Sequence, residues 1–225
     1  MNNYSTLFRE ALARHHHPEN ALQMKQYMRN QYDFFGIKAH ERKSILNAFI
    51  TENGYPKDLP ATVKAWWAEP EREFQLCAME LMERRKRQAI QNWVDTYKWM
   101  ITQKSWWDTV DFIATKQVGY HFQRFPEIQN EYINAWMDSE NIWLQRTCLL
   151  FQLKYKTQTN WELLQQLINE LKDSREFFIR KAIGWALREY SKTYPDRVAN
   201  FVSATALSGL SEREALKVIR KNSGF

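Results

Sequence analysis

Apolar residues recur at helical spacing along nearly the whole chain, which is the pattern of helices that bury one face. No stretch alternates apolar and polar positions clearly enough to predict a strand. We therefore expect an all-α fold. The predicted helices cover residues 3–16, 19–34, 39–53, 58–68, 70–86, 88–103, 106–117, 126–138, 140–157, 159–171, 174–193, 195–204 and 211–222.

Glycine, proline and serine set several of these boundaries. Gly36 and Gly54 are expected to end helices, because glycine accepts the left-handed conformation found just after a helix. Ser211 followed by Glu214 matches a capping box at a helix start. Proline suits the first turn of a helix, and four prolines are predicted to occupy one: Pro18, Pro70, Pro126 and Pro195.

A helical pattern repeats every 35 residues, in blocks that begin at Pro70, Ser105, Glu140 and Arg175. A period of this length with two helices per unit is typical of HEAT-like arrays, which curve and bind partners on the concave face. No linker or low-complexity segment divides the chain. Residues 1–225 are therefore expected to form a single domain.

The repeat gives three charged residues equivalent positions. Asp111, Arg146 and Lys181 lie 35 residues apart, and aromatic residues surround each of them. Stacking of repeats brings equivalent positions side by side. A carboxylate, a guanidinium and an ammonium aligned beside tryptophans predict a functional site rather than a core.

Each aromatic neighbour also has a structural interpretation. Trp107 precedes Asp111 by four residues and shares its helix face, but helical tryptophans usually belong to the core. Trp185 follows Lys181 by four residues, with Arg188 one turn further on. That arrangement suits nucleic-acid sugars and phosphates, and it equally suits core packing with solvated charges.

Arg146 has two interpretations of equal weight. Its forked guanidinium suits phosphate oxygens. The 35-residue spacing also predicts an ion pair with Asp111 of the adjacent repeat. The sequence leaves both open.

Charge is concentrated near the C-terminus. Lys and Arg number 32 against 26 acids, which gives +6 and a pI near 9.2. Residues 175–225 hold ten Lys or Arg and five acids, so +5 of the +6 lies there. This balance fits a polyanion partner.

The remaining composition argues against several classes of protein. Cys77 and Cys148 lie in apolar helical patterns, so we expect buried thiols in a reducing cytoplasm. No apolar run has membrane length, and neither a signal peptide nor a membrane partner is expected. Three adjacent histidines at 15–17 cannot all face one metal from a helix, and no Gly-rich phosphate loop, CxxC, HExxH or GxSxG motif occurs. No cofactor and no metal are expected.

Three long segments resemble those of the AlkD family, bacterial DNA alkylation repair glycosylases built of HEAT-like repeats. They are KSWWDTVD at 104–111, NIWLQR at 141–146 and KAIGWALREY at 181–190, and the likeness extends over essentially the whole chain. It implies a right-handed superhelical array of HEAT-like repeats, C-shaped with a concave groove for duplex DNA. It also implies an enzyme that removes cationic N3- and N7-alkylated purines, such as 3-methyladenine and 7-methylguanine, and leaves an abasic site.

The resemblance assigns roles to four residues of the predicted site. Asp111 matches the catalytic aspartate of the family. Trp107 and Trp185 match an aromatic pair that packs against the sugar and backbone of the lesion. Arg146 matches an arginine that supports the site.

DNA contacts are expected at three further positions. Tyr27 and Arg188 match other cleft residues of the family, and Lys181 is included because the repeat aligns it with Arg146. The segments 54–60 and 117–126 match no motif of the family, which leaves their contacts undefined rather than the chemistry.

The expected chemistry needs one carboxylate. An alkylated purine is already cationic, so it leaves without a general acid, and the carboxylate of Asp111 stabilises the oxocarbenium-like sugar and orients water. Electron-rich indoles add cation–π stabilisation. No lysine is obviously placed as a Schiff-base nucleophile, so we expect a monofunctional enzyme that senses the lesion through its sugar and backbone.

Two other functions fit the sequence less well. A HEAT-like module that binds distorted DNA without chemistry predicts binding without base release. A protein–protein scaffold predicts no affinity for duplex DNA. We expect a monomer in the bacterial cytoplasm, associated with the nucleoid when acting.

Overall fold

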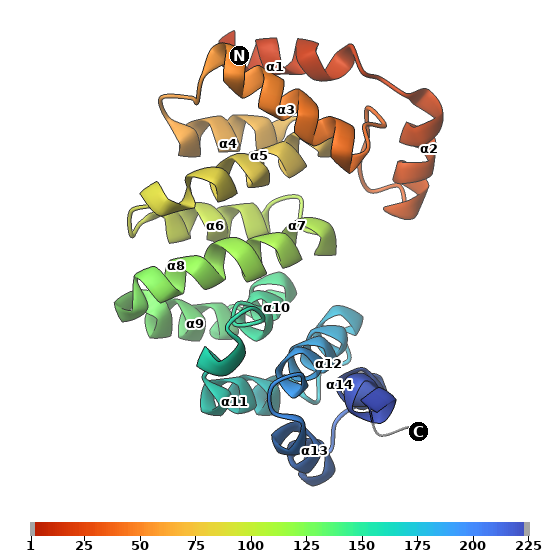
Figure 1. Cartoon of the computed structure of the whole chain (residues 1–225), viewed down its shortest axis with the longest axis vertical. Helices are drawn as coiled ribbons and strands as arrows, with labels where there is room; N and C mark the ends of the chain where they lie inside the picture. Colours follow the sequence, from red (N-terminus) through yellow and green to blue (C-terminus); the bar gives the residue numbers. More distant parts are fainter. Residues whose placement is uncertain (1–2, 223–225) are drawn as a thin grey trace. The chain divides into compact units, whose positions relative to one another are not determined.

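The structure, a computed structural model, describes residues 3–222 and confirms the predicted all-α fold. Within these residues the only β-type pairing is an isolated bridge between Asp33 and Glu71. The chain divides into two compact units, residues 1–96 and 97–225. Figure 1 shows the helices of both units, coloured along the sequence. The single domain and the curved array stay predictions.

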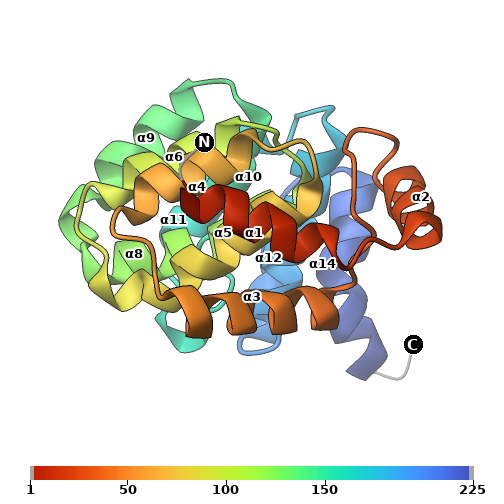
Figure 2. The ribbon, with the colours of Figure 1, turned by 90° about the horizontal axis from the view of Figure 1, so that it is seen from above.

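The first unit is built around an aromatic core. Phe8 of α1 stacks on Trp66 of α4 with ring centroids 4.0 Å apart, and Phe49 and Phe74 close the cluster. In Figure 2, α1 lies across the ribbons of this unit. The helices are α1 (Asn3–Ala13), α2 (Pro18–Tyr27), α3 (Ala39–Asn53), α4 (Leu59–Ala68), α5 (Arg72–Arg85) and the 3-10 turn η1 (Lys86–Gln88).

The helix predicted at 19–34 is shorter than expected. α2 ends at Tyr27, and Arg29 and Asn30 then adopt positive φ angles of 55° and 57°. Two consecutive left-handed residues cannot continue a right-handed helix. The prediction missed this stop because neither residue is a glycine.

Gly36 does not end a helix, contrary to the prediction, but supports a close approach. Its φ is +86°, and a Cβ there would lie 2.2 Å from the His17 carbonyl oxygen and 2.6 Å from the Ala21 nitrogen. The loop before α3 therefore packs directly on the backbone at the start of α2. Gly54, by contrast, caps α3 as predicted, with φ at 71°.

The second unit contains the residues of the predicted site. Its boundary with the first unit falls within α6 (Trp93–Thr102). The other elements are α7 (Trp107–Phe112), the π-helix η2 (Ile113–Val118), α8 (Gly119–Arg124), η3 (Pro126–Ile128), α9 (Gln129–Asp138), α10 (Ile142–Leu150), η4 (Lys156–Gln158), α11 (Trp161–Leu171), α12 (Phe177–Ser191), α13 (Pro195–Ala204) and α14 (Gly209–Asn222).

The helix that begins at Trp107 runs much further than predicted. It continues through η2 into α8, whereas the predicted helix ends at residue 117. Gly119 makes this possible, because a Cβ there would lie 2.3 Å from the Phe151 carbonyl oxygen. The Tyr155 hydroxyl also donates to the Gly119 carbonyl at 2.5 Å. Tertiary packing thus overrides the helix-breaking tendency of glycine.

Other boundaries differ by less. The helix predicted at 140–157 ends at Leu150, and Lys156 then takes a positive φ of 55°.

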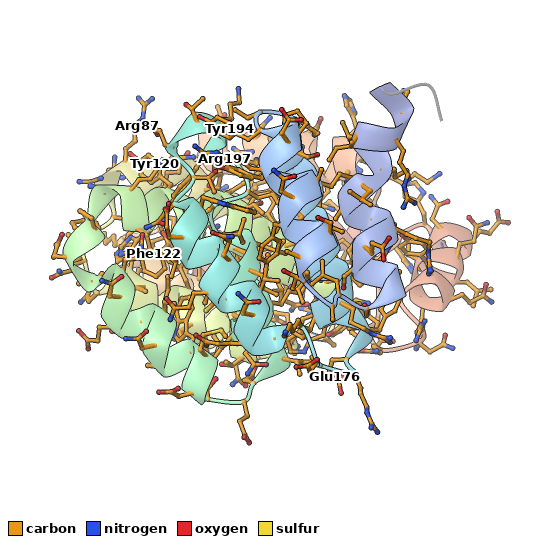
Figure 3. The ribbon with its side chains drawn as sticks, turned by 90° about the horizontal axis from the view of Figure 1, so that it is seen from below. Arg87, Tyr120, Phe122, Glu176, Tyr194 and Arg197 are labelled. Carbon is orange, nitrogen blue, oxygen red and sulfur yellow. The ribbon has the colours of Figure 1, made fainter. Side chains whose placement is uncertain are left out.

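At the start of α13, the Arg197 guanidinium lies 4.9 Å from the centre of the Tyr194 ring (Figure 3). It also donates to the Tyr190 hydroxyl at 3.4 Å.

Each unit contains one buried cysteine. Cys77 lies in α5 and Cys148 in α10, and both are free thiols with almost no exposed surface. Burial raises the pKa of both thiols well above the usual range. The predicted burial is confirmed. Over the described range, no helix combines the length and the apolar character needed to cross a membrane.

Candidate active site

Asp111 is held in an arginine fork. Its Oδ1 accepts a hydrogen bond from Arg146 Nε at 2.7 Å, and its Oδ2 accepts one from Arg146 Nη2 at 2.8 Å. This bidentate geometry is the strongest form of a carboxylate–guanidinium contact. It confirms the ion-pair interpretation of Arg146, across a sequence separation of 35 residues.

The start of α10 fixes the position of Arg146. Asn141 caps this helix, because its side-chain oxygen accepts hydrogen bonds from Trp143 N and Leu144 N at 3.0 and 3.2 Å. Arg146 follows one turn later, and Nη1 donates to the carbonyl oxygen of Phe178 at the start of α12. The guanidinium thus joins α7, α10 and α12.

Burial decides the electrostatics of the pair. The side chain of Arg146 is 5% exposed and that of Asp111 is 16% exposed. Burial raises the pKa of Asp111, the Arg146 hydrogen bonds oppose this rise, and the negative charge of Asp108 adds to it. Arg146 is too buried to serve as an open phosphate contact, whereas the side chain of Asp111 keeps part of its surface exposed.

An aromatic cluster packs against the buried pair. The rings of Trp106, Trp143 and Phe178 lie 4.9 to 5.9 Å apart, centre to centre. The Arg146 guanidinium lies 5.8 Å from the centre of the Phe178 ring. We did not predict roles for these residues, although Trp143 and Phe178 occupy the same position in successive repeats. That equivalence was the signal available in the sequence.

Lys181 and Arg188 do not join the Asp111–Arg146 pair. Both bind Glu214 of α14, with Lys181 Nζ 2.9 Å from Oε1 and Arg188 Nη1 2.7 Å from Oε2. Lys181 in particular lowers the pKa of Glu214. The structure therefore brings together two of the three residues aligned by the repeat, and it pairs the third elsewhere.

This pairing corrects the predicted capping box. α14 begins at Gly209, and the Ser208 hydroxyl accepts a hydrogen bond from Ser211 N at 3.2 Å. The Ser211 hydroxyl instead donates to the Arg180 carbonyl of α12 at 2.9 Å. Glu214 cannot reach back to cap the helix because it binds Lys181 and Arg188.

The three remaining predicted residues are all partly or fully accessible. Trp107 begins α7, one turn before Asp111, and is half-buried. Trp185 is half-buried in α12, between Lys181 and Arg188. Tyr27, at the end of α2 in the first unit, is 72% exposed. Accessible aromatic side chains are available to stack on a ligand.

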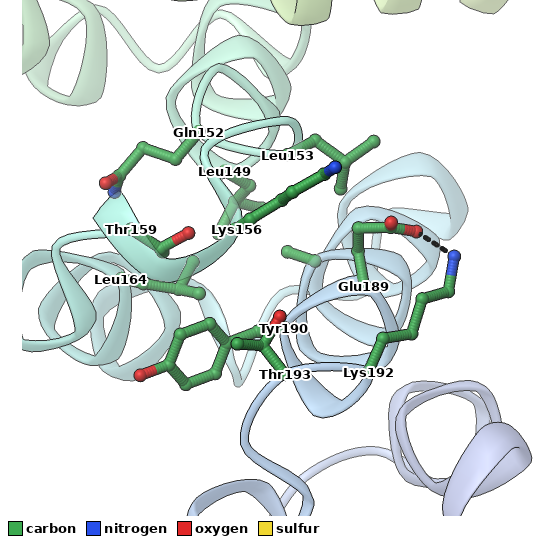
Figure 4. A pocket seen from close by; sticks show the side chains of 11 residues that line it. Leu149, Gln152, Leu153, Lys156, Thr159, Leu164, Glu189, Tyr190, Lys192 and Thr193 are labelled. Carbon is green, nitrogen blue, oxygen red and sulfur yellow. Dashed lines mark hydrogen bonds and ion pairs between the residues drawn. The ribbon is translucent and has the colours of Figure 1, made fainter.

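The second unit also contains a hollow of about 120 Å³ that the predicted site residues do not line. Figure 4 shows its walls, which come from the end of α10, from η4, from α11 and from the second half of α12. Leu149, Leu164 and Ala186 form its apolar part, and Lys156 and an ion-paired Glu189 lie at its edge.

Among residues 3–222, no three His, Cys, Asp or Glu side chains form a group able to hold a metal.

The fold and the site define an all-helical protein with a half-buried carboxylate, clamped by an arginine beside accessible tryptophans. The sequence profile of the family described as DNA alkylation repair enzyme matches residues 8–219. The chain belongs to this family.

A solved structure gives the same result. It is described as a predicted DNA alkylation repair enzyme from Enterococcus faecalis, with 35% sequence identity and a TM-score of 0.85. The match covers 92% of this chain and 97% of that one. No curated protein matches the chain.

Proposed function

We propose that the protein is a monofunctional DNA glycosylase that removes N3- and N7-alkylated purines from duplex DNA and leaves an abasic site. The observation that carries this proposal is the half-buried Asp111 carboxylate, fixed by two hydrogen bonds from Arg146. Membership of a family of DNA alkylation repair enzymes supports DNA as the substrate.

The chemistry follows from the charge of the lesion. Water oxygen bonds to C1′ of the sugar while the C1′–N bond breaks, and the electrons of that bond neutralise the cationic base. Asp111 stabilises the positive charge that develops on the sugar, and it accepts a proton from the attacking water. A desolvated carboxylate whose pKa is raised is a stronger base than an exposed one.

The neighbouring residues would support this step without taking part in it. Arg146 fixes both carboxylate oxygens and leaves their other lone pairs for water and the sugar. Trp107 and Trp185 would stack on the sugar and backbone and add cation–π stabilisation. The lesion would thus be sensed through its sugar and backbone.

Two observations support a monofunctional enzyme. A lyase step needs a nucleophilic amine, and Lys181, in α12, is ion-paired with Glu214. A cationic leaving group also needs no proton donor, so the single carboxylate suffices. Tyr27, Lys181 and Arg188 would contact the duplex, and the protein would act as a monomer in the cytoplasm without metal or cofactor.

The test compares release of 7-methylguanine and 3-methyladenine from methylated duplex DNA by three proteins. The wild type should release both, and Asp111→Asn should be slower by about 100-fold or more, because it loses the charge and the base. Asp108→Asn, a neighbouring half-buried carboxylate, is the matched control and should keep most of the activity.

The results separate the proposal from its competitors. Parental release by Asp111→Asn would overturn the role of Asp111. Duplex binding without release by the wild type would instead identify a non-catalytic module that binds distorted DNA. Failure to bind duplex at all would favour a protein–protein scaffold.

A further inference from the structure

Five of the ten cations in the basic C-terminal quarter, residues 175–225, have a partner. Lys192 pairs with Glu189 at 2.6 Å, and Arg197 lies against the ring of Tyr194 (Figure 3). Lys181 and Arg188 share Glu214. Arg220 lies 3.5 Å from Glu212. The excess positive charge must therefore come from the cations that remain.

Three of the remaining cations lie on one helix. Arg213, Lys217 and Lys221 are exposed residues of α14, each four positions from the next. Across the described part of the chain, none of their side chains forms an ion pair or hydrogen bond. Exposed lysines and arginines usually find carboxylate neighbours on a helix of mixed charge. These three do not.

Helix geometry places the three cations on one stripe. Residues four apart share a face, so their side chains follow one another along the axis. The opposite face is fixed by packing, since Ala215 and Ser211 are buried. The stripe therefore points to solvent and cannot turn inward.

Glu214 joins this stripe to α12. It follows Arg213 directly and binds Lys181 and Arg188. Gly184 permits the contact between the helices, because a Cβ there would lie 2.5 Å from Glu214 Cβ. The two packed helices together thus carry five cations and one carboxylate. We call this group the α12–α14 basic face, and its members are Lys181, Arg188, Arg213, Glu214, Lys217 and Lys221.

We propose that the α12–α14 basic face binds the phosphate backbone of the duplex, with Arg213, Lys217 and Lys221 each contacting a phosphate. Eight residues of helix span about 12 Å. One DNA strand carries a charge about every 3.4 Å along its axis, so three to four phosphates occupy about the same length. The spacing and sign of the stripe match this ligand. The inference rests on the proposed function for the identity of the duplex.

An anionic membrane fits this face less well. Helices that bind membranes at their surface bury an exposed apolar stripe beside their basic one. The apolar side chains Leu216, Val218 and Ile219 of α14 are all partly buried in the fold. The exposed part of α14 is therefore polar and charged, which suits phosphates in water.

The test measures binding of a short undamaged duplex as a function of salt, so no catalysis is needed. The variant is Arg213→Gln with Lys217→Gln and Lys221→Gln. Glutamine keeps helix propensity and length while it removes the charge. The control is Lys57→Gln with Arg84→Gln and Lys98→Gln. It removes three exposed cations of other segments that form no ion pair or side-chain hydrogen bond among the described residues. Both variants should melt like the wild type.

Loss of three phosphate contacts should reduce the slope of log K against log salt by about 2.7. The wild type should thus lose about 40-fold more affinity than the α14 variant between about 50 and 200 mM salt. The control should keep the wild-type slope. Equal slopes for the wild type and the α14 variant would overturn the proposal.

Two further measurements assign the ligand and separate the proposals. Vesicles of phosphatidylserine are offered to the same proteins, and loss of vesicle binding with unchanged DNA binding would overturn the proposal in favour of lipid. Base release from methylated DNA is measured separately. A protein that releases no base but shows the slope change would keep the basic face and overturn only the proposed chemistry.

Discussion

The Asp111–Arg146 pair is an interaction whose two members cannot be exchanged independently. A buried arginine and carboxylate offset each other's desolvation only while both are present. Removal of one leaves an uncompensated charge in a region of low exposure. The same contact that would orient Asp111 for the proposed chemistry therefore also stabilises the second unit.

Arg146→Ala should accordingly destabilise the fold by about 3–5 kcal/mol. It should also slow base release by about 100-fold, because Asp111 loses its orientation. The salt slope of duplex binding should stay at the wild-type value, since Arg146 is 5% exposed and bonded to Asp111 and Phe178. Urea unfolding, base release and salt titration measure the three effects.

A second buried pair supplies the control. Arg42 Nη2 lies 2.8 Å from Glu80 Oε1 in the first unit, with similar burial. Arg42→Ala should destabilise the protein comparably and leave base release intact below the melting temperature. A flattened salt slope for Arg146→Ala would contradict the structural assignment and restore a phosphate contact.

At the scale of elements, the close contact between α12 and α14 depends on the absence of a side chain at Gly184. A Cβ at Gly184 would lie 2.5 Å from Glu214 Cβ and 2.9 Å from the Ser211 carbonyl oxygen. One of these neighbours belongs to the backbone and cannot move alone. The helices would have to separate, which also pulls Glu214 away from Lys181 and Arg188.

Gly184→Ala should therefore destabilise the protein by about 1–3 kcal/mol, despite the higher helix propensity of alanine. Urea unfolding followed by tryptophan fluorescence measures the change. Gly209→Ala is the control, because its Cβ would meet only the flexible tip of Arg213, at 3.2 Å. A variant at Gly184 as stable as the wild type would show that α14 is not held this closely.

Elements were predictable from sequence where local pattern and packing agree. The cap at Gly54 and the positions of α3, α11 and α13 follow from periodicity and end signals. The continuation of the helix through η2 and Gly119 was not predictable, because it depends on packing of Gly119 against Phe151, which is distant in sequence. The pairing of Glu214 was missed for the same cause, since the local capping motif competes with two partners from α12.

For the candidate site, the sequence predicted partners but not burial. The 35-residue period correctly placed Asp111 beside Arg146. It could not distinguish a phosphate contact from an ion pair, because that distinction depends on how deeply the guanidinium is buried. The hydrogen bond from Arg146 to Phe178 was also not predictable from sequence, because its acceptor is a backbone carbonyl that every residue has.

At the scale of the whole molecule, the residues proposed for chemistry all belong to residues 97–225. The Asp111–Arg146 pair, Trp107, Trp185 and the α12–α14 basic face fall within this unit. The first unit contributes Tyr27, the most exposed large apolar side chain among the described residues. The proposed catalysis and the proposed phosphate contacts nearest to it would thus depend on the folding of one unit.

The two buried cysteines allow the stability of each unit to be measured separately. Each thiol is inaccessible in the folded state, and burial raises its pKa, so a thiol reagent should react only after local opening exposes it. Cys77 therefore reports opening of the first unit and Cys148 opening of the second. Single Cys→Ser variants isolate the two rates.

If residues 1–225 unfold as one cooperative domain, both thiols should be labelled with the same opening free energy. Two different values, read from labelling rates under native conditions, would instead give the separate stability of each unit. Labelling of Cys77 and Cys148 would then show whether the unit that contains Asp111 stays folded while the other unit opens.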